Sequence, residues 1–227
     1  MLKRPRFALS VLLSFCGPLV AQPSYYTGAL GGVSTLSADG RSLFVSGGAS
    51  TSLYKPENGP LLNLFAGIHL SDFLSVQGNY VWNRNDVALV SLVAPDHGTA
   101  LAYQQNRGSR QHAVFGEALI FFRNRDSRVR PFLSAGIGAV SLRSDEKLVT
   151  NVSGNPLLPP AVFSAAKPAF RTAVGIDLSL GPRLQFRYSF AEAIHGNEFS
   201  RYLSPPGQRN LAHFQNLFGF VVRLQRR

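Results

Sequence analysis

The pattern that decides the fold is clearest at residues 183–190, which read Arg-Leu-Gln-Phe-Arg-Tyr-Ser-Phe. Every even position holds a large apolar side chain, and every odd position holds a polar one. Successive side chains of a β-strand point to opposite faces, so this period of two predicts a strand rather than a helix. The same alternation runs through residues 170–180 and 213–224, and the even face of all three runs carries no charged residue.

The odd face of these runs combines small residues with charges. It holds Gly, Ala and Ser beside Arg171, Asp177, Arg183, Arg187 and Arg223. Small residues fit the crowded interior of a narrow barrel, whereas a solvated face usually carries Lys, Glu and Thr. A soluble sheet also alternates, with its apolar face inward, so the alternation alone leaves open which face is inside.

The spacing of the strands is a second, independent signal. Eight strands are predicted at residues 25–37, 59–71, 73–84, 111–123, 129–142, 169–180, 183–195 and 212–225. Each is long enough for a tilted membrane-spanning strand of about 9–11 residues. Tight turns alternate with long connections, which lie at residues 38–58, 85–110, 143–168 and 196–211 and collect Pro, Gly, Asn and Ser. Short periplasmic turns and long extracellular loops are typical of outer-membrane barrels, so the sequence predicts an all-β, eight-stranded, antiparallel up-and-down transmembrane barrel.

The first residues read as a cleaved secretory signal. Lys3, Arg4 and Arg6 precede an apolar core at residues 7–15, and a cleavage site follows Ala21. We therefore expect residues 1–21 to be the signal peptide and residues 22–227 to be one barrel domain. Removal of three basic residues lowers the net charge from +11 to +8.

Composition narrows the class further. Only 15% of the residues are charged, against roughly 25% in soluble globular chains, which argues against disorder and long helical bundles. The single cysteine, Cys16, lies in the predicted signal, where Phe15 argues against a lipoprotein box. No disulfide, thiol chemistry or Cys-rich metal site is expected in the mature chain.

Lipid offers the backbone no hydrogen-bond partner, so a β structure in a membrane must close on itself. Eight strands enclose a space about wide enough to be filled by side chains, and charges inside must pair. The expected interior polar network consists of Glu117, Arg130, Arg171, Asp177 and Arg187. Glycines such as those of Gly-Ile-Gly at residues 136–138 are interpreted as interior space, not as a phosphate-binding loop.

Four segments resemble the small outer-membrane β-barrel proteins that share the fold of the OmpA membrane domain. They are residues 128–138, 173–178, 184–188 and 218–224. The resemblance implies either a structural or interaction role in the cell envelope or a narrow channel. It also implies that the barrel-insertion machinery assembles the protein. Many such proteins end on an aromatic residue, whereas this chain ends Leu224-Gln225-Arg226-Arg227, so Phe218 and Phe220 are expected to serve as the assembly signal.

Catalysis is not expected. The five histidines are His69, His97, His112, His195 and His213, and none lies in a metal-type cluster. Ser189, Glu192, His195 and Glu198 contain the residue types of a lipid hydrolase, but no nucleophile elbow marks the serine. We therefore predict no catalytic residue, no metal and no cofactor.

The expected partner is outer-membrane lipid, including lipopolysaccharide. Arg201 and Arg209 lie in a long loop and are the candidate anion contacts, since Arg pairs well with phosphate. Export and the scatter of basic residues argue against nucleic acid. The sequence thus predicts a bacterial outer-membrane barrel with a structural or interaction role. A narrow channel or small-molecule carrier, a lipid-modifying hydrolase and a soluble lipocalin-type barrel remain as alternatives.

Overall fold

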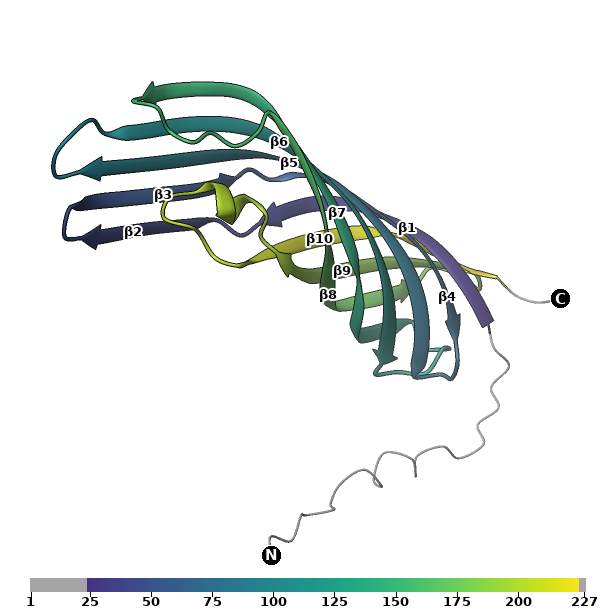
Figure 1. Ribbon diagram of the computed structural model, residues 1–227. Coiled ribbons are helices and arrows are strands. Elements are labelled where there is room, and N and C mark those ends of the chain that lie inside the picture. Colours follow the sequence, from purple (N-terminus) through teal and green to yellow (C-terminus); the bar gives the residue numbers. More distant parts are fainter. Residues whose placement is uncertain (1–23, 225–227) are drawn as a thin grey trace, which may run out of the picture.

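The computed structural model describes residues 24–224, and almost all of them lie in antiparallel strands (Figure 1). The elements are β1 (Ser24–Leu36), β2 (Asp39–Val45), β3 (Gly48–Pro56), β4 (Gly59–His69), β5 (Leu74–Pro95), β6 (Leu101–Phe121), β7 (Val129–Ser153), β8 (Val162–Ser179), β9 (Leu184–Gly196), the short 3-10 helix η1 (Phe199–Tyr202) and β10 (Asn210–Leu224). The predicted signal peptide and its cleavage site lie outside the described residues. In the part of the chain that the structure describes, no helix is both long and apolar enough to cross a membrane.

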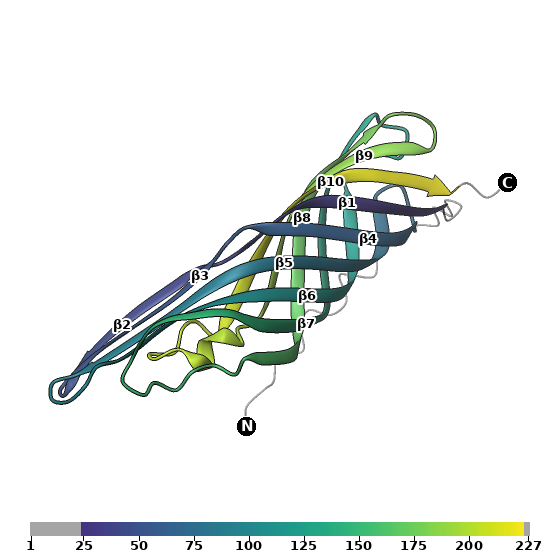
Figure 2. The same ribbon diagram turned by 90° about the horizontal axis from the view of Figure 1, so that it is seen from above.

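Eight of the ten strands form a closed ring. The first strand, β1, pairs with both β4 and β10, and the remaining pairs follow the chain from β4 to β10. All pairings are antiparallel, and the two ends of the described chain lie at the same end of the ring (Figures 1 and 2). We call this the proximal end and the opposite one the distal end. The predicted eight-stranded up-and-down barrel is confirmed.

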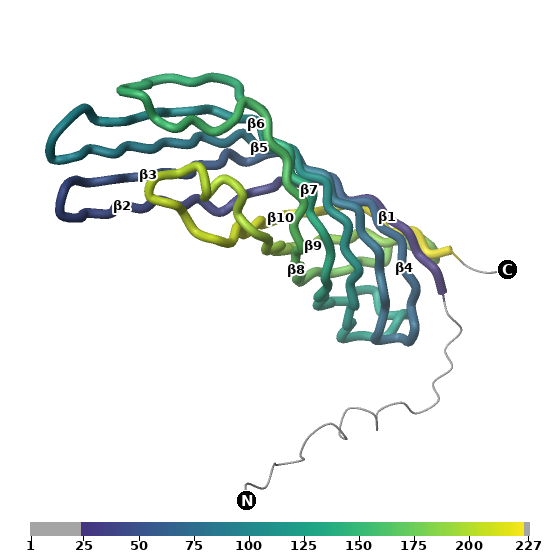
Figure 3. Tube along the Cα trace, in the orientation of Figure 1, coloured from purple at the N-terminus to yellow at the C-terminus, as the bar shows by residue number. Residues whose placement is uncertain are grey.

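The connections predicted as long loops are mostly strands. Residues 39–56 form the β2–β3 hairpin, which joins the sheet through β5, and β5–β6 and β7–β8 run on far beyond the ring. These extensions project from the distal end as a curved sheet, which is clear in the trace of Figure 3. We define the distal sheet as residues 39–56, 85–95, 101–109 and 144–153. Gly, Pro and Asn in these segments are typical of loops, but pairing with a long neighbouring strand keeps the segments extended.

The apolar faces point outward. Tyr188 and Phe220 are 42% and 51% exposed, and the ring of Phe186 meets that of Phe220 edge to face. Their polar neighbours Gln185 and Arg187 are buried inside the ring. A lipocalin-type barrel would place the apolar faces inside, so the structure excludes that alternative.

Candidate functional site: the filled barrel interior

The proximal half of the lumen contains a buried ion pair between neighbouring strands. Asp177 of β8 stands directly opposite Arg187 of β9, and the guanidinium donates to both carboxylate oxygens at 2.6 and 2.8 Å. A third nitrogen of Arg187 donates to Gln77 Oε1 at 3.0 Å, and the group lies over the rings of Phe65 and Phe132. Three hydrogen bonds and two aromatic rings therefore hold this arginine inside the lumen.

A second buried ion pair joins strands that are not neighbours. Arg171 of β8 donates to Glu117 of β6, and β7 lies between them. The inward position on β7 is Gly136, which stands opposite both residues and has no side chain to separate them. Ser134 donates to the other oxygen of Glu117 at 3.2 Å, and Arg171 donates to Gln215 at 3.1 Å. The layer therefore spans the barrel from β6 to β10.

The fifth predicted residue, Arg130, is buried but forms a different set of contacts. It stands opposite Asp177 in the register, yet that carboxylate is held by Arg187. Its guanidinium donates to the carbonyl oxygen of Asp72 at 2.9 Å and lies 3.9 Å from the centre of the Phe121 ring. Turn carbonyls and an aromatic ring thus replace the carboxylate partner expected from the sequence.

A third polar layer, toward the distal end, was not identified in the sequence. His213 Nε2 lies 2.5 Å from Ser34 Oγ, and the Ser34 hydroxyl donates to Asn85 Oδ1 at 3.0 Å. Asn83 donates to Asn85 in turn, at 2.8 Å. The signal that could have found this layer is the pair of Asn residues at alternate positions of one strand, since residues i and i+2 share a face.

An apolar cluster closes the distal mouth above these layers. Its buried members are Leu36, Tyr54, Val87, Leu89, Tyr103, Leu142, Phe163, Phe199, Leu203 and Leu211. Phe199 and Leu203 belong to the β9–β10 connection, which folds back over the mouth (Figure 1). The Tyr103 hydroxyl fixes this connection by donating to the Tyr202 carbonyl at 2.6 Å. The cluster gives the distal sheet a hydrophobic core of its own.

Burial in this cluster changes the titration of its polar groups. It raises the pKa of Tyr103 to about 12 and also raises that of Tyr54. Burial also lowers the pKa of Arg107, whose guanidinium donates to Ser144 and lies over the Phe163 ring. Desolvation disfavours the charged form of each group, which is the common cause of the three shifts.

The two loop arginines proposed as anion contacts differ in their surroundings. Arg201 forms an ion pair with Glu198 at 2.6 Å, and Lys167 approaches the other oxygen of that carboxylate at 3.1 Å. Hydrogen bonding to the Tyr202 hydroxyl raises the pKa of Arg201. Arg209 is exposed. An internal carboxylate therefore competes with any anion at Arg201.

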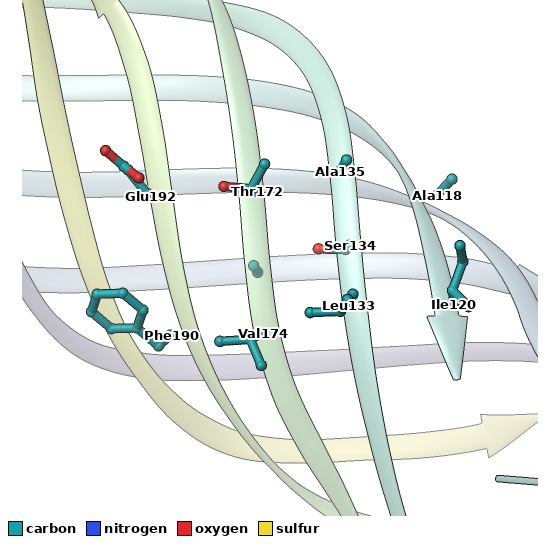
Figure 4. Close-up of a pocket in the computed structure, with 10 residues that line it drawn as sticks. Ala118, Ile120, Leu133, Ser134, Ala135, Thr172, Val174, Phe190 and Glu192 are labelled. Carbon is teal, nitrogen blue, oxygen red and sulfur yellow. The ribbon is translucent and has the colours of Figure 1, made fainter. Parts of the chain in front are cut away.

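The residue types of a hydrolase are not assembled. Ser189 and His195 are buried and face the lumen, whereas Glu192 faces outward between Phe190 and Ile194. Figure 4 shows Glu192 beside Thr172, at the edge of a hollow of about 520 Å³ on the outer face of β6–β9. Within residues 24–224, no group of three His, Cys, Asp or Glu side chains is placed to hold a metal ion.

No protein-family model matches the chain, and no curated protein matches it. Solved structures do. Neisserial surface protein A (NspA) has a TM-score of 0.50 and 12% identity, over 90% of this chain and all of that one. The chain has the fold of the small outer-membrane β-barrels.

Two further barrels of this type match over most of the chain. Ail of Yersinia pestis, in complex with a heparin analogue, has a TM-score of 0.47 and 9% identity over 88% of this chain and 99% of that one. The N-terminal barrel domain of Pseudomonas aeruginosa OprF has a TM-score of 0.42 and 10% identity, over 87% of this chain and 99% of that one. At these identities the likeness concerns the small-barrel fold alone.

Proposed function

We propose that the protein is an integral outer-membrane barrel with a structural or interaction role, without catalysis and without a permanent pore. The observation that carries this proposal is the filling of the lumen at successive levels. Two buried ion pairs occupy its proximal half, and an apolar cluster covers its distal mouth. A water-filled path would have to break both kinds of packing.

The distal sheet is the proposed interaction surface, and it faces the cell exterior in this proposal. The last three residues of β2, beside the turn to β3, are Leu43, Phe44 and Val45, and Phe44 is 79% exposed. Exposed clusters of large apolar residues mark sites of contact with proteins or membranes. The extracellular ends of outer-membrane barrels are the longer ones, which agrees with this orientation.

Planar-bilayer recording of the purified protein tests the closed lumen. We expect no steady conductance at moderate voltage, because the ion-pair layers and the apolar cluster block the path. Steady single-channel openings would instead establish the channel alternative. The orientation is tested by labelling a Phe44→Cys variant on intact cells with a membrane-impermeant maleimide, and absence of labelling on a folded barrel would contradict it.

The proposed partners are the lipids of the outer membrane and, during assembly, the barrel-insertion machinery. The proposed contacts with the phosphates of lipopolysaccharide are Arg201 and Arg209. Of the two, Arg209 has the freer position, since Arg201 is already paired with Glu198. Comparison of lipids from cells with and without the protein tests the hydrolase alternative, and we expect identical lipid profiles.

A further inference from the structure

The outer face of β5, β6 and β7 is built in straight rows of register partners. From the proximal end, the rows are Leu74–Ile120–Leu133, Val76–Ala118–Ala135, Gly78–Gly116–Ile137, Tyr80–Val114–Ala139 and Trp82–His112–Ser141. None of these five rows contains Asp, Glu, Lys or Arg. The sixth row consists of Arg84, Arg110 and Arg143.

Three arginines therefore stand side by side on adjacent strands, with exposed side chains. Like charges directly opposite each other in a sheet are destabilising. The next row along the same face holds two acids, Asp145 and Asp86. Asp145 lies 3.2 Å from Arg143 and 3.8 Å from Arg110, whereas Asp86 is paired with Lys147 at 2.5 Å. Among residues 24–224, no carboxylate forms an ion pair with Arg84. Two carboxylates against the three arginines and Lys147 leave this surface with an excess of positive charge.

The height of the row on the barrel places it at a membrane surface. Ten residues separate Leu74 from Arg84, which at about 3.3 Å per residue and a tilt of about 40° rise about 25 Å. The apolar band of outer-membrane barrels is about 25 Å tall, and aromatic residues flank it. Tyr80 and Trp82 lie just below the arginines, as expected for side chains at the headgroup level.

We propose that Arg84, Arg110 and Arg143 bind the phosphate group of an outer-leaflet lipid, namely a phosphorylated glycolipid of the lipopolysaccharide type. Guanidinium groups bind phosphate bidentately, and an anion between them would relieve their mutual repulsion. This site rests on the proposed membrane location and is separate from the loop arginines.

The surface below the row fits the rest of such a lipid. A shallow outer-face hollow of about 810 Å³ is lined by β1, β4, β5, β6 and β10, and it includes Tyr80 and Val114. These two residues lie two rows below Arg84 and Arg110. Small residues widen the hollow, among them Ala66 and Gly78. An acyl chain of a lipid whose phosphate sits on the arginines can lie along this hollow.

The test measures binding of bisphosphorylated lipid A to the purified full-length barrel in detergent. Replacing all three arginines, R84Q/R110Q/R143Q, should weaken binding by about tenfold or more, because charge-assisted hydrogen bonds are lost. The variant removes like-charge contacts together with two exposed ion pairs to Asp145, which contribute little to stability, so it should fold as well as the wild type. Heat-modifiable gel migration checks this. Unchanged binding by a folded variant would overturn the proposal.

A matched control removes the same charge elsewhere. Arg123, Arg128 and Arg183 are exposed in the proximal turns, so R123Q/R128Q/R183Q should bind lipid A as the wild type does. An equal loss in this control would show that net charge, not the row, drives binding. The variant R201Q/R209Q separates this site from the proposed loop contacts, and a greater loss there than in the row variant would overturn the proposal.

Two further measurements identify the ligand as a lipid phosphate. Enzymatically dephosphorylated lipid A should bind the wild type as weakly as lipid A binds the row variant. Inorganic phosphate should not displace lipid A at equal concentration, because it lacks contacts with the hollow. Equal binding of the dephosphorylated lipid, or full displacement by inorganic phosphate, would contradict the assignment.

Discussion

Arg171 is bound to Glu117 although a complete strand, β7, lies between the strands that carry them. The contact is possible because Gly136 occupies the position between them on the lumen side. A Cβ atom at Gly136 would lie 2.5 Å from Glu117 Cγ and 2.2 Å from the Gly116 carbonyl oxygen. The absence of a side chain at Gly136 therefore lets the Arg171 and Glu117 side chains meet across β7.

Gly136→Ala should therefore destabilise the barrel by about 1–3 kcal/mol, the usual cost of overpacking. Urea unfolding in detergent, followed by the gel shift, measures the change. Gly116→Ala is the matched control, since a Cβ there has no neighbour within 4 Å and points to the outer face. Equal losses from both substitutions would contradict the role assigned to Gly136.

Removing one member of the buried pair should cost more than removing both. Glu117→Gln leaves the buried guanidinium of Arg171 uncompensated, for which about 3–5 kcal/mol is expected. The double variant E117L/R171M should recover most of that loss, because a well-packed apolar pair often replaces a buried ion pair without penalty. Equilibrium unfolding of the wild type, E117L, R171M and E117L/R171M measures the coupling, and additive losses would argue against a direct interaction.

The apolar cluster should hold the distal sheet independently of the ring. F199S/L203S removes two buried side chains from it, so the distal strands should become sensitive to protease while the ring keeps its heat-modifiable migration. Phe44→Ser, at an exposed site in the same sheet, should leave the protease pattern of the β9–β10 connection unchanged. Loss of the gel shift in F199S/L203S would show that the ring depends on the cluster.

The distal sheet should loosen at high pH. The pKa of Tyr103 is about 12 in the folded chain and 10 when unfolded, so the folded state holds the proton more tightly. The stability this provides is complete below pH 10 and is lost as the pH rises from about 10 toward 12. Protease sensitivity of the distal sheet against pH measures the effect, and the variant Y54F/Y103F should lose this pH dependence.

A charge in the middle of the uncharged rows should be costly only if lipid covers them. Ile137 is 74% exposed in the third row, so Ile137→Arg should cost about 2–4 kcal/mol in a membrane. Leu157 is 90% exposed beyond the ring, and Leu157→Arg should cost almost nothing. Unfolding in lipid vesicles compares the two variants, and equal stability would place Ile137 in water.

The fold was predictable because the strand signal is local. Residues 183–190 alternate with a period of two, and the spacing of such runs gave eight strands with boundaries within a few residues of those observed in the ring. The prediction of loops at residues 85–110 and 143–168 was wrong in large part. Whether a polar segment stays extended there depends on a partner strand, and the sequence of one strand does not contain that information.

The interior could be predicted only as a set of residue types. Alternation placed Glu117, Arg171, Asp177 and Arg187 on one face and identified glycine as interior space, but it could not show which charges meet. The strand register sets Arg171 and Glu117 on either side of Gly136, where they form an ion pair. Arg130 instead donates to backbone carbonyl oxygens such as that of Asp72.

By itself, therefore, the sequence determined the strand period and the number of strands in the ring, since both follow from patterns local in the chain. The alternation left open which face looks outward, and the structure decided it. Only the tertiary structure decided the ion pairs of the lumen, the closure of the distal mouth and the row of Arg84, Arg110 and Arg143. The physical reason is that these contacts join residues far apart in sequence, and their distances are set by the register and stagger of closed strands rather than by any local pattern.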